Sequence, residues 1–271
     1  MTEAGAAPRF AFGKNWQHFL GRLDDDRIAK AARSVQAFLP AASISGKTWL
    51  DIGSGSGLSS LVATRLGCSR VHSFDYDTDS VECTREMKRR YFADAPHWCI
   101  ERGSVLDRDY LDALGTWDIV YAWGVLHHTG SMWTALGNAA DRVSPGGLLW
   151  IAIYNDQGGI SVRWRKIKSL YNRSRWGRAL VLGTCIPYFA LRGLVGDLLR
   201  RQDPTRRYRN YRQGRGMSVL HDWIDWLGGS PFEVATPEAI LDFYRPRGFV
   251  LERLKTCGGS LGCNEFLFRK E

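Results

Sequence analysis

Short apolar runs that alternate regularly with helical stretches constrain the fold of this chain more than any other feature. The apolar runs lie at 48–52, 70–75, 97–101, 117–123 and 148–154. Stretches with helical character lie between them at 57–66, 78–92 and 131–143. Strand and helix in repetition predict a parallel sheet covered by helices on both faces.

The alternation stops after Tyr154 for about eighty residues and resumes with a helix expected at 236–248. Thr236 is suited to cap this helix, and Pro237 suits its first position. Two further strands follow, separated by the turn GGSLG, and they predict a closing antiparallel pair. The expected fold class is therefore α/β: a doubly wound, Rossmann-like, seven-stranded sheet, mostly parallel with an antiparallel last strand, and with a helical insertion between strands 5 and 6.

A chain of 271 residues is close to the largest size for a single hydrophobic core. We therefore expect one core domain, built from 45–156 and 236–271, with additions. Residues 1–44 form an expected N-terminal helical cap, whose helix at 24–39 begins with an acidic first turn. Residues 157–235 form the expected basic helical insertion.

Composition and cysteine spacing indicate a cytoplasmic protein. Hydrophobic residues make up 44% of the chain and charged residues 24%, which is ordinary for a globular domain. The six cysteines form no CxxC pair and no zinc-type spacing with histidine, so we expect a reduced compartment and no metal. The N-terminus lacks the basic and apolar regions of a secretory signal.

The turn DIGSGSG at 51–57 directly follows the first expected strand. A dinucleotide-binding turn requires GxGxxG, but Leu58 occupies the third glycine position after Gly53 and Gly55. The GxGxG spacing instead suits a smaller ligand whose carboxylate lies against backbone amides. Asp51, two residues before the first glycine, is placed to hold an ammonium group, so the ligand carries both charges of a methionine moiety.

A second acid, Asp75, ends the next strand, twenty-two residues beyond Gly53. In such a fold a carboxylate at this position accepts hydrogen bonds from both ribose hydroxyls of an adenosine. Methionine and ribose together indicate S-adenosylmethionine as cofactor. The alternative is a tight structural turn with an incidental aspartate at the strand end.

Four motifs resemble those of the class I S-adenosylmethionine-dependent methyltransferases: DxGxGxG at 51–57, FDYD at 74–77, GSVLD at 103–107 and WDIVYAWGVLHHTG at 117–130. The resemblance covers roughly 45–156 and 236–270. Within this superfamily the sequence is similar to small-molecule methyltransferases such as the O-methyltransferases of ubiquinone biosynthesis. The resemblance implies a set of cofactor contacts along the methionine end, the ribose and the adenine. These are Asp51, Gly53, Ser54, Gly55 and Gly57 for methionine, Asp75 and Tyr76 for ribose and adenine, and Ser104 with Val105 for the adenine edge.

The fourth expected strand ends in WGVLHHTG, in the crevice where open α/β sheets bind ligands. Trp123, His127 and His128 are therefore expected near the transferable methyl group, Trp123 as a cofactor contact. Methyl transfer is an in-line displacement, and a base assists it when the acceptor is a protonated hydroxyl or amine. His128 is the first candidate base and His127 the second; the alternative is that these histidines only order the loop.

Two further groups are expected on the acceptor side. Asn155 and Asp156 follow the fifth strand and point into the same crevice; Asn155 is a candidate acceptor contact and Asp156 a candidate catalytic residue. The segment HDWIDW supplies a candidate wall of the acceptor pocket: His221, Asp222, Trp223 and Trp226. Its alternative is an amphipathic helix that packs its tryptophans in a core. Near the start of the chain, FGKNWQHF is a candidate cover, with Lys14 or Trp16 touching the cofactor.

The basic insertion admits two interpretations. Residues 157–215 contain fifteen Lys or Arg and two Asp, although the net charge of the whole chain is only +9. Its aromatic residues suit nucleic acid, which makes an RNA methyltransferase one alternative. Its apolar part, 179–199, contains Pro187 and no uncharged run beyond thirteen residues, which predicts a segment too short and broken to span a membrane.

We therefore favour a lid over a small-molecule or lipid-linked acceptor, with contact to an anionic membrane surface. The predicted activity is S-adenosylmethionine-dependent methyl transfer, to oxygen, in the cytoplasm or at the inner membrane surface. An S-adenosylmethionine-binding regulatory protein without catalysis is a second alternative. The sequence defines no oligomeric state.

Overall fold

The computed structural model describes residues 13, 16, 20–21, 23–205, 219–259 and 262–271. Its centre is a seven-stranded sheet in the order β3-β2-β1-β4-β5-β7-β6. The strands are β1 (Thr48–Ile52), β2 (Arg70–Asp75), β3 (Trp98–Arg102), β4 (Trp117–Trp123), β5 (Val143–Tyr154), β6 (Phe249–Lys255) and β7 (Cys263–Lys270). Strands β1 to β5 are parallel, and β7 is antiparallel to both of its neighbours, β5 and β6. The predicted fold class is confirmed.

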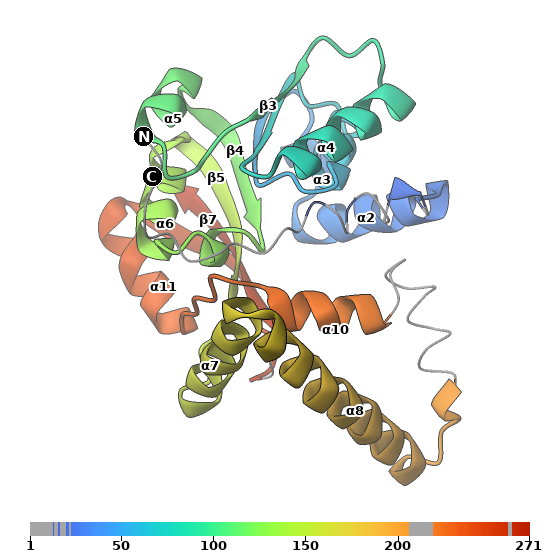
Figure 1. The fold of residues 1–271 in the computed structure, drawn as a ribbon. Coiled ribbons are helices and arrows are strands. Elements are labelled where there is room, and N and C mark those ends of the chain that lie inside the picture. Colours follow the sequence, from blue (N-terminus) through green and yellow to red (C-terminus); the bar gives the residue numbers. More distant parts are fainter. Residues whose placement is uncertain (1–12, 14–15, 17–19, 22, 206–218, 260–261) are drawn as a thin grey trace.

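Helices cover both faces of the sheet (Figure 1). One face carries α2 (Asp25–Phe38), α3 (Leu58–Arg65) and α4 (Thr78–Tyr91), and the other carries α5 (Arg108–Leu114), α6 (Met132–Asp141) and α11 (Pro237–Tyr244). The alternation of side chains along β1 supplies both cores, since Trp49 packs with the first set of helices and Leu50 and Ile52 with the second.

Polar caps fix where several of these helices begin. The side chains of Asp24, Asp77, Asp107 and Thr236 accept hydrogen bonds from backbone amides in the first turns of α2, α4, α5 and α11. The predicted Thr236 cap is therefore confirmed, with Pro237 at the first helical position. Helix α5 has no counterpart among the expected helices, and β5 begins at Val143, five residues before the expected strand.

In the described part of the segment between β5 and α11, helices form a layer beyond the carboxyl ends of the parallel strands (Figure 1). They are α7 (Gly159–Arg173), α8 (Arg175–Leu199) and α10 (Val219–Gly228). They share a small core of their own, centred on Tyr171, Val181 and Leu227. The helical insertion between strands 5 and 6 is thus present.

Helix α8 corrects one expectation. It runs unbroken through Pro187 for 25 residues, because a proline inside a helix removes one backbone hydrogen bond without stopping the turns on either side. Within the described residues it is the one helix long and apolar enough to cross a membrane by length and composition, and only 11% of its most apolar window is buried. The prediction of a segment too short and broken for this was wrong.

Candidate active site

The glycine-rich turn between β1 and α3 requires glycine for steric reasons. Gly53, Gly55 and Gly57 have φ of 72°, 54° and 79°, in the left-handed region that side chains disfavour. A Cβ on Gly53 would lie 2.4 Å from Cγ1 of Val125, and one on Gly57 would lie 2.9 Å from Cα of Thr84. The turn is therefore held tightly between α4 and the loop that follows β4.

The described N-terminal residues lie against this turn. A Cβ on Gly55 would be 3.1 Å from the indole of Trp16, and the amide of Gly13 donates to Oδ2 of Asp77 at 2.9 Å. Trp16 is thus placed beside the glycine-rich turn, as expected for a cover. Lys14 lies outside the described residues. Contact of Trp16 with a bound cofactor stays a prediction.

Asp51 is almost completely buried at the end of β1, with 1% of its surface exposed. One oxygen, Oδ2, accepts hydrogen bonds from the hydroxyls of Ser59 at 2.8 Å and Ser60 at 2.5 Å. Burial raises the pKa of the Asp51 carboxyl to about 6, although the two serines oppose the shift. A cationic group placed beside Asp51 would relieve this cost, which is the property that an ammonium site needs.

Asp75, at the end of β2, accepts the amide of Gly55 at 3.0 Å through Oδ2 and the amide of Asp77 at 2.9 Å through Oδ1. Burial raises the pKa of this carboxyl to about 6 as well, against the effect of these amides. Each oxygen of a carboxylate has two lone pairs, so both oxygens keep capacity for a further donor. Asp75 is therefore fixed in orientation and chemically suited to bind two hydroxyl groups.

The side chains expected around adenine have different environments. Tyr76 is 49% exposed, and the guanidinium of Arg102 lies 5.4 Å from its ring centre. The hydroxyl of Ser104 accepts the amide of Leu106 at 3.2 Å. Val105 is buried, with 6% of its surface exposed. The roles of Tyr76, Ser104 and Val105 in adenine binding stay predictions.

The two neighbouring histidines after β4 differ sharply. His127 has no exposed surface, and its ring packs 4.0 Å from that of Tyr154. In His128, Nδ1 lies 2.7 Å from the carbonyl oxygen of Pro231. Because a carbonyl only accepts, Nδ1 carries the proton and Nε2 carries the lone pair. Burial lowers the pKa of His128 to about 4 and that of His127 well below its usual range, so both rings are neutral at pH 7.

Other candidates have structural partners. Oδ1 of Asn155 accepts the side-chain amide of Asn264 at 3.0 Å, which ties the end of β5 to β7. Oδ1 of Asp156 accepts the amide of Gly158 at 2.9 Å. Trp123, at the end of β4, is 44% exposed. Contact of these three residues with cofactor or acceptor stays a prediction.

In α10, Trp226 packs edge-on to Tyr154, with ring centres 5.5 Å apart, and Trp223 packs on Phe189 of α8 at 5.5 Å. Trp226 therefore joins the aromatic surroundings of the two histidines, and Trp223 packs against α8. His221 and Asp222 lie in α10, but their side chains are outside the described part of the structure.

One buried residue, Lys168 of α7, was missed by the sequence analysis. Its Nζ donates to the carbonyl of Trp226 and lies 4.2 Å from the Trp226 ring centre and 4.9 Å from that of Phe232. Burial lowers its pKa to about 7. Helical spacing from the apolar positions Trp164 and Tyr171 is the signal that would have placed it on the inner face.

The seven-stranded sheet with β7 antiparallel, and the glycine turn beside Asp51 and Asp75, define an α/β protein of the methyltransferase type. Residues 23–201 match the methyltransferase domain family, and the chain belongs to this family. The ribosomal protein L11 methyltransferase of Alteromonas mediterranea is 40% identical over 53 residues, which cover 20% of this chain and 18% of that protein.

Solved structures share the fold at low sequence identity. Magnesium protoporphyrin IX methyltransferase from Synechocystis PCC 6803, with bound S-adenosylhomocysteine, matches with a TM-score of 0.58 and 15% identity, covering 95% of this chain and 94% of that one. The N-methyltransferase NodS from Bradyrhizobium japonicum WM9, with the same ligand, has a TM-score of 0.51, 14% identity, and coverage of 96% and 99%. An O-methyltransferase family protein from Burkholderia thailandensis has a TM-score of 0.54, 14% identity, and coverage of 98% and 65%.

These findings confirm the class predicted from the sequence, an S-adenosylmethionine-dependent methyltransferase. The residues present fit that cofactor. Gly53, Gly55 and Gly57 leave the turn without side chains, and the carboxylates of Asp51, which is buried, and Asp75, which accepts the Gly55 amide, lie beside it. Structural relatives include both O- and N-methyltransferases, so the fold does not select the acceptor atom.

Proposed function

We propose that the protein transfers a methyl group from S-adenosylmethionine to an oxygen atom of a small or lipid-linked acceptor. The geometry of His128 carries this proposal. Its backbone amide donates to the carbonyl of Val125 at 2.9 Å, and Val125 is the residue that closes on Gly53. The candidate base and the glycine-rich turn are therefore held by one short loop.

The residues that would hold the cofactor follow from their donors and acceptors. Asp75 would accept the ribose hydroxyls, Asp51 would face the ammonium group, and the glycine turn would lie along the methionine moiety. The bound cofactor supplies an electrophilic methyl group on a sulfonium. The protein's main contribution is to hold acceptor and cofactor in line.

His128 would accept the proton of the acceptor hydroxyl. The Pro231 carbonyl fixes the ring and keeps the proton on Nδ1, so the lone pair is on Nε2. A pKa of about 4 keeps the ring in its neutral, proton-accepting form at pH 7. Such a base weakens the O–H bond as the methyl group is transferred, and it returns the proton to water afterwards. An acceptor without an ionisable proton would not need this group.

The test combines cofactor binding with methyl transfer. Calorimetry with S-adenosylhomocysteine establishes the site, and S-adenosylmethionine with a labelled methyl group is then incubated with total metabolites, lipid extract or RNA. Label in an alkali-stable ether or an ester of a metabolite or lipid, lost in His128→Ala and kept in the control His97→Ala, supports the proposal. Label in RNA would replace it with the alternative activity. Tight binding without transfer to any fraction would favour the non-catalytic alternative.

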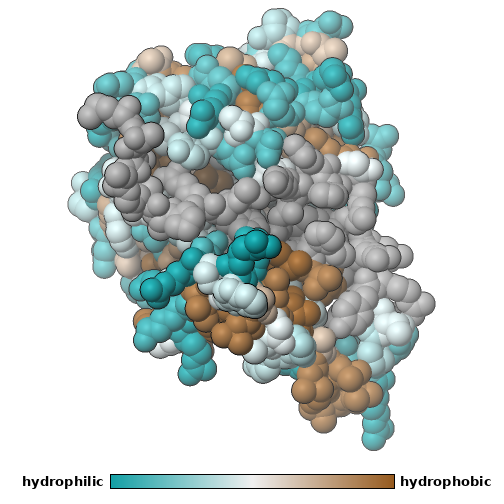
Figure 2. Space-filling view, viewed as in Figure 1, coloured by the Kyte–Doolittle hydropathy of each residue, from teal (hydrophilic) through white to brown (hydrophobic). Residues whose placement is uncertain are grey.

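We further propose that helix α8 attaches the protein to an anionic membrane surface. Trp176, Leu180, Leu191 and Leu198 are 87%, 58%, 61% and 59% exposed. Their spacings of 4, 11 and 7 residues place them on one stripe of the helix. Figure 1 shows α8 projecting from the body, and Figure 2 shows hydrophobic surface along this part of the molecule.

The charges on α8 support a lipid surface as the partner. Arg175 and Arg178 lie in its first turn, and Arg200 follows its end, whereas the helix contains one acid, Asp197, which is buried. An apolar stripe flanked by arginines suits the boundary between acyl chains and anionic headgroups. The protein would then be cytoplasmic and peripheral to the inner face of the membrane, close to a lipid-linked acceptor.

A further inference from the structure

A cleft of about 620 Å³ lies between α7 and the segment 230–234, outside the glycine-rich turn. Arg165, Lys168 and Arg173 of α7 line one side, with Asn172 beside them. Gly130, just before α6, and Trp133, in its first turn, also line the cleft. The cleft thus brings three cationic side chains and an amide to one concave surface.

These cations lack anionic partners in the described part of the protein. None of Arg165, Lys168 and Arg173 takes part in the ion pairs within 4.0 Å formed by the described residues. The one acid lining the cleft is Glu233, and both of its oxygens accept the amide of Met132, at 3.2 and 3.1 Å. The Glu233 carboxylate is therefore bound to the backbone at the amino-terminal end of α6, where a negative charge is favourable.

Lys168 is the one buried cation among the residues that line the cleft. It has 1% of its surface exposed, and its Nζ donates to the Trp226 carbonyl beside the rings of Trp226 and Phe232. An ammonium group has three donors, and burying it without an anion is costly. The structure keeps this group at the cleft wall, where a bound anion would compensate its charge.

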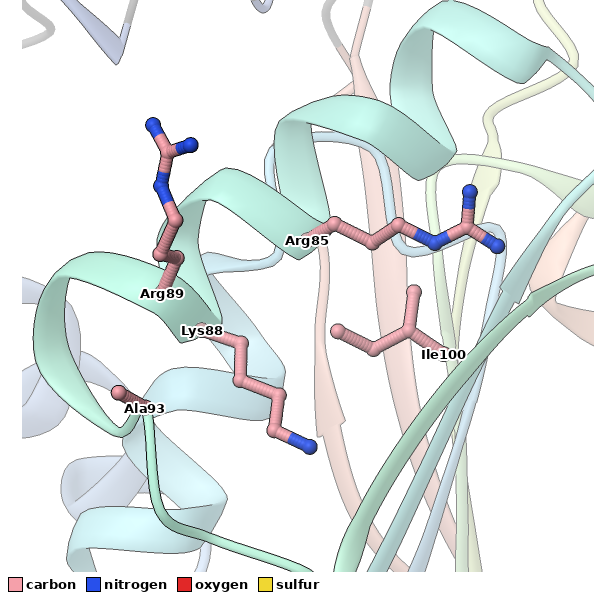
Figure 3. A pocket seen from close by; sticks show the side chains of 5 residues that line it. All are labelled: Arg85, Lys88, Arg89, Ala93 and Ile100. Carbon is pink, nitrogen blue, oxygen red and sulfur yellow. The ribbon is translucent and has the colours of Figure 1, made fainter.

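A second basic hollow, beside α4, provides a contrast (Figure 3). It is lined by Arg85, Lys88 and Arg89, whose side chains point in different directions. Arg85 and Arg89 form ion pairs with Glu82 and Glu86, and Nζ of Lys88 donates to the carbonyl of Trp98 at 2.6 Å. Because the charges of Arg85 and Arg89 are already compensated by glutamates of the same helix, a bound anion would stabilise this hollow less.

We propose that the cleft on α7 binds the anionic group, a phosphate or a carboxylate, of the methyl acceptor. The assignment to the acceptor rests on the proposed function. It is supported by Pro231, which lines the cleft and whose carbonyl also accepts a hydrogen bond from Nδ1 of His128. Pro231 therefore both lines the cleft and orients the candidate base.

The cleft has a thermodynamic property that can be measured. Lys168, with a pKa of about 7, is protonated at pH 6 and mostly neutral at pH 8, while Arg165 and Arg173 keep their charge. His127 and His128 face Lys168, but their lowered pKa values leave both neutral over this range. Glu233 is the one carboxylate among the lining residues. Anion affinity should thus fall by up to about tenfold between pH 6 and pH 8.

Sulfate is the suitable probe, because its charge is constant over this range and any pH dependence belongs to the protein. Calorimetry on the full chain should show sulfate binding that weakens from pH 6 to pH 8. Arg165→Gln should weaken it about tenfold, whereas Arg163→Gln, an exposed position on α7 outside the cleft, should not. Lys168→Met should remove the pH dependence, and unchanged S-adenosylhomocysteine affinity would show that this variant is folded.

Absence of sulfate binding, or binding equally strong in Arg165→Gln and Arg163→Gln, would overturn the proposal. Sulfate binding is measured without turnover, so its outcome is independent of methyl transfer and of His128. Competition then separates the sources of the anion. A soluble phosphate monoester that displaces sulfate indicates a free phosphorylated acceptor. Displacement only by vesicles containing phosphatidic acid, and not by neutral phosphatidylcholine vesicles, indicates a lipid-linked one.

Discussion

Replacing Asp51 by asparagine should make the cofactor-free protein more stable while weakening cofactor binding. Asp51 is buried, and the pKa of its carboxyl is raised from 3.8 to about 6. Raising the pKa by this amount means that the ionised carboxylate destabilises the folded state by about 3 kcal/mol at pH 7.5. Asparagine removes that charge. It also keeps both serine hydrogen bonds, because Ser59 and Ser60 donate to the same oxygen, Oδ2.

The direction of the pH dependence follows from the raised pKa. The folded protein binds the Asp51 proton more tightly than the unfolded chain does, so the free energy of unfolding should increase as pH falls from 7 through 6 towards 4. In Asp51→Asn this increase should become smaller. It should not disappear, since the pKa of Asp75 is also raised to about 6.

Urea denaturation followed by tryptophan fluorescence, at pH 7.5 and pH 5, measures both effects. We expect Asp51→Asn to be more stable than wild type at pH 7.5 by about 1 to 3 kcal/mol, with S-adenosylhomocysteine bound about tenfold less tightly. Asp118→Asn is the matched control. Asp118 lies at the start of β4, and its Oδ2 also accepts two hydrogen bonds, from the backbone amide and the hydroxyl of Thr48. It should leave cofactor affinity unchanged. A variant at position 51 that is less stable than wild type at pH 7.5 would refute the reasoning.

Four further outcomes are expected. Asp75→Ala should weaken S-adenosylhomocysteine binding about 10- to 100-fold by calorimetry, and unchanged affinity would contradict its role at the ribose. His128→Ala should slow methyl transfer by about 10² to 10⁴ without changing cofactor affinity, so equal rates would exclude it as the base. Gly57→Ala, at a φ of 79° and 2.9 Å from a backbone atom, should lower thermal stability by about 1 to 3 kcal/mol in a melting experiment. Leu191→Asp with Leu198→Asp should weaken sedimentation with anionic vesicles at least about tenfold, and unaltered sedimentation would argue against the α8 surface.

The sequence predicts those strands that are buried on both faces and bounded by turn residues. The bounds of β1, β2 and β4 coincide with the apolar runs, and a glycine or an acidic residue stands at or just after the end of each run. The first five residues of β5, VSPGG, contain no apolar alternation, and pairing of Val143 with Trp117 extends the strand through them. Helix α5 has only seven residues, RDYLDAL, and it depends on the Asp107 cap and on burial of Leu111.

Some residues of the candidate site are determined by local sequence, and others by packing between segments that are distant in the chain. The glycine turn is predictable because its left-handed conformation is required at Gly53, Gly55 and Gly57 whatever packs around it. Lys168 is one of many cations in a basic segment, and only the packing of α7 against α10 distinguishes it. Sequence composition predicts that the insertion is basic, but not which cation is buried.

The two histidines show most clearly what the sequence leaves open. They are adjacent in the chain, yet the short helical turn at Leu126–His128 directs His127 into the interior, with no exposed surface, and His128 towards Pro231. The partner that sets the tautomer of His128 lies 103 residues further along the chain, after the whole insertion. Which histidine can act as a base is therefore decided by how the insertion returns to the core. A change in the segment around Pro231 should alter catalysis by changing the orientation of His128, while leaving the glycine turn and cofactor affinity intact.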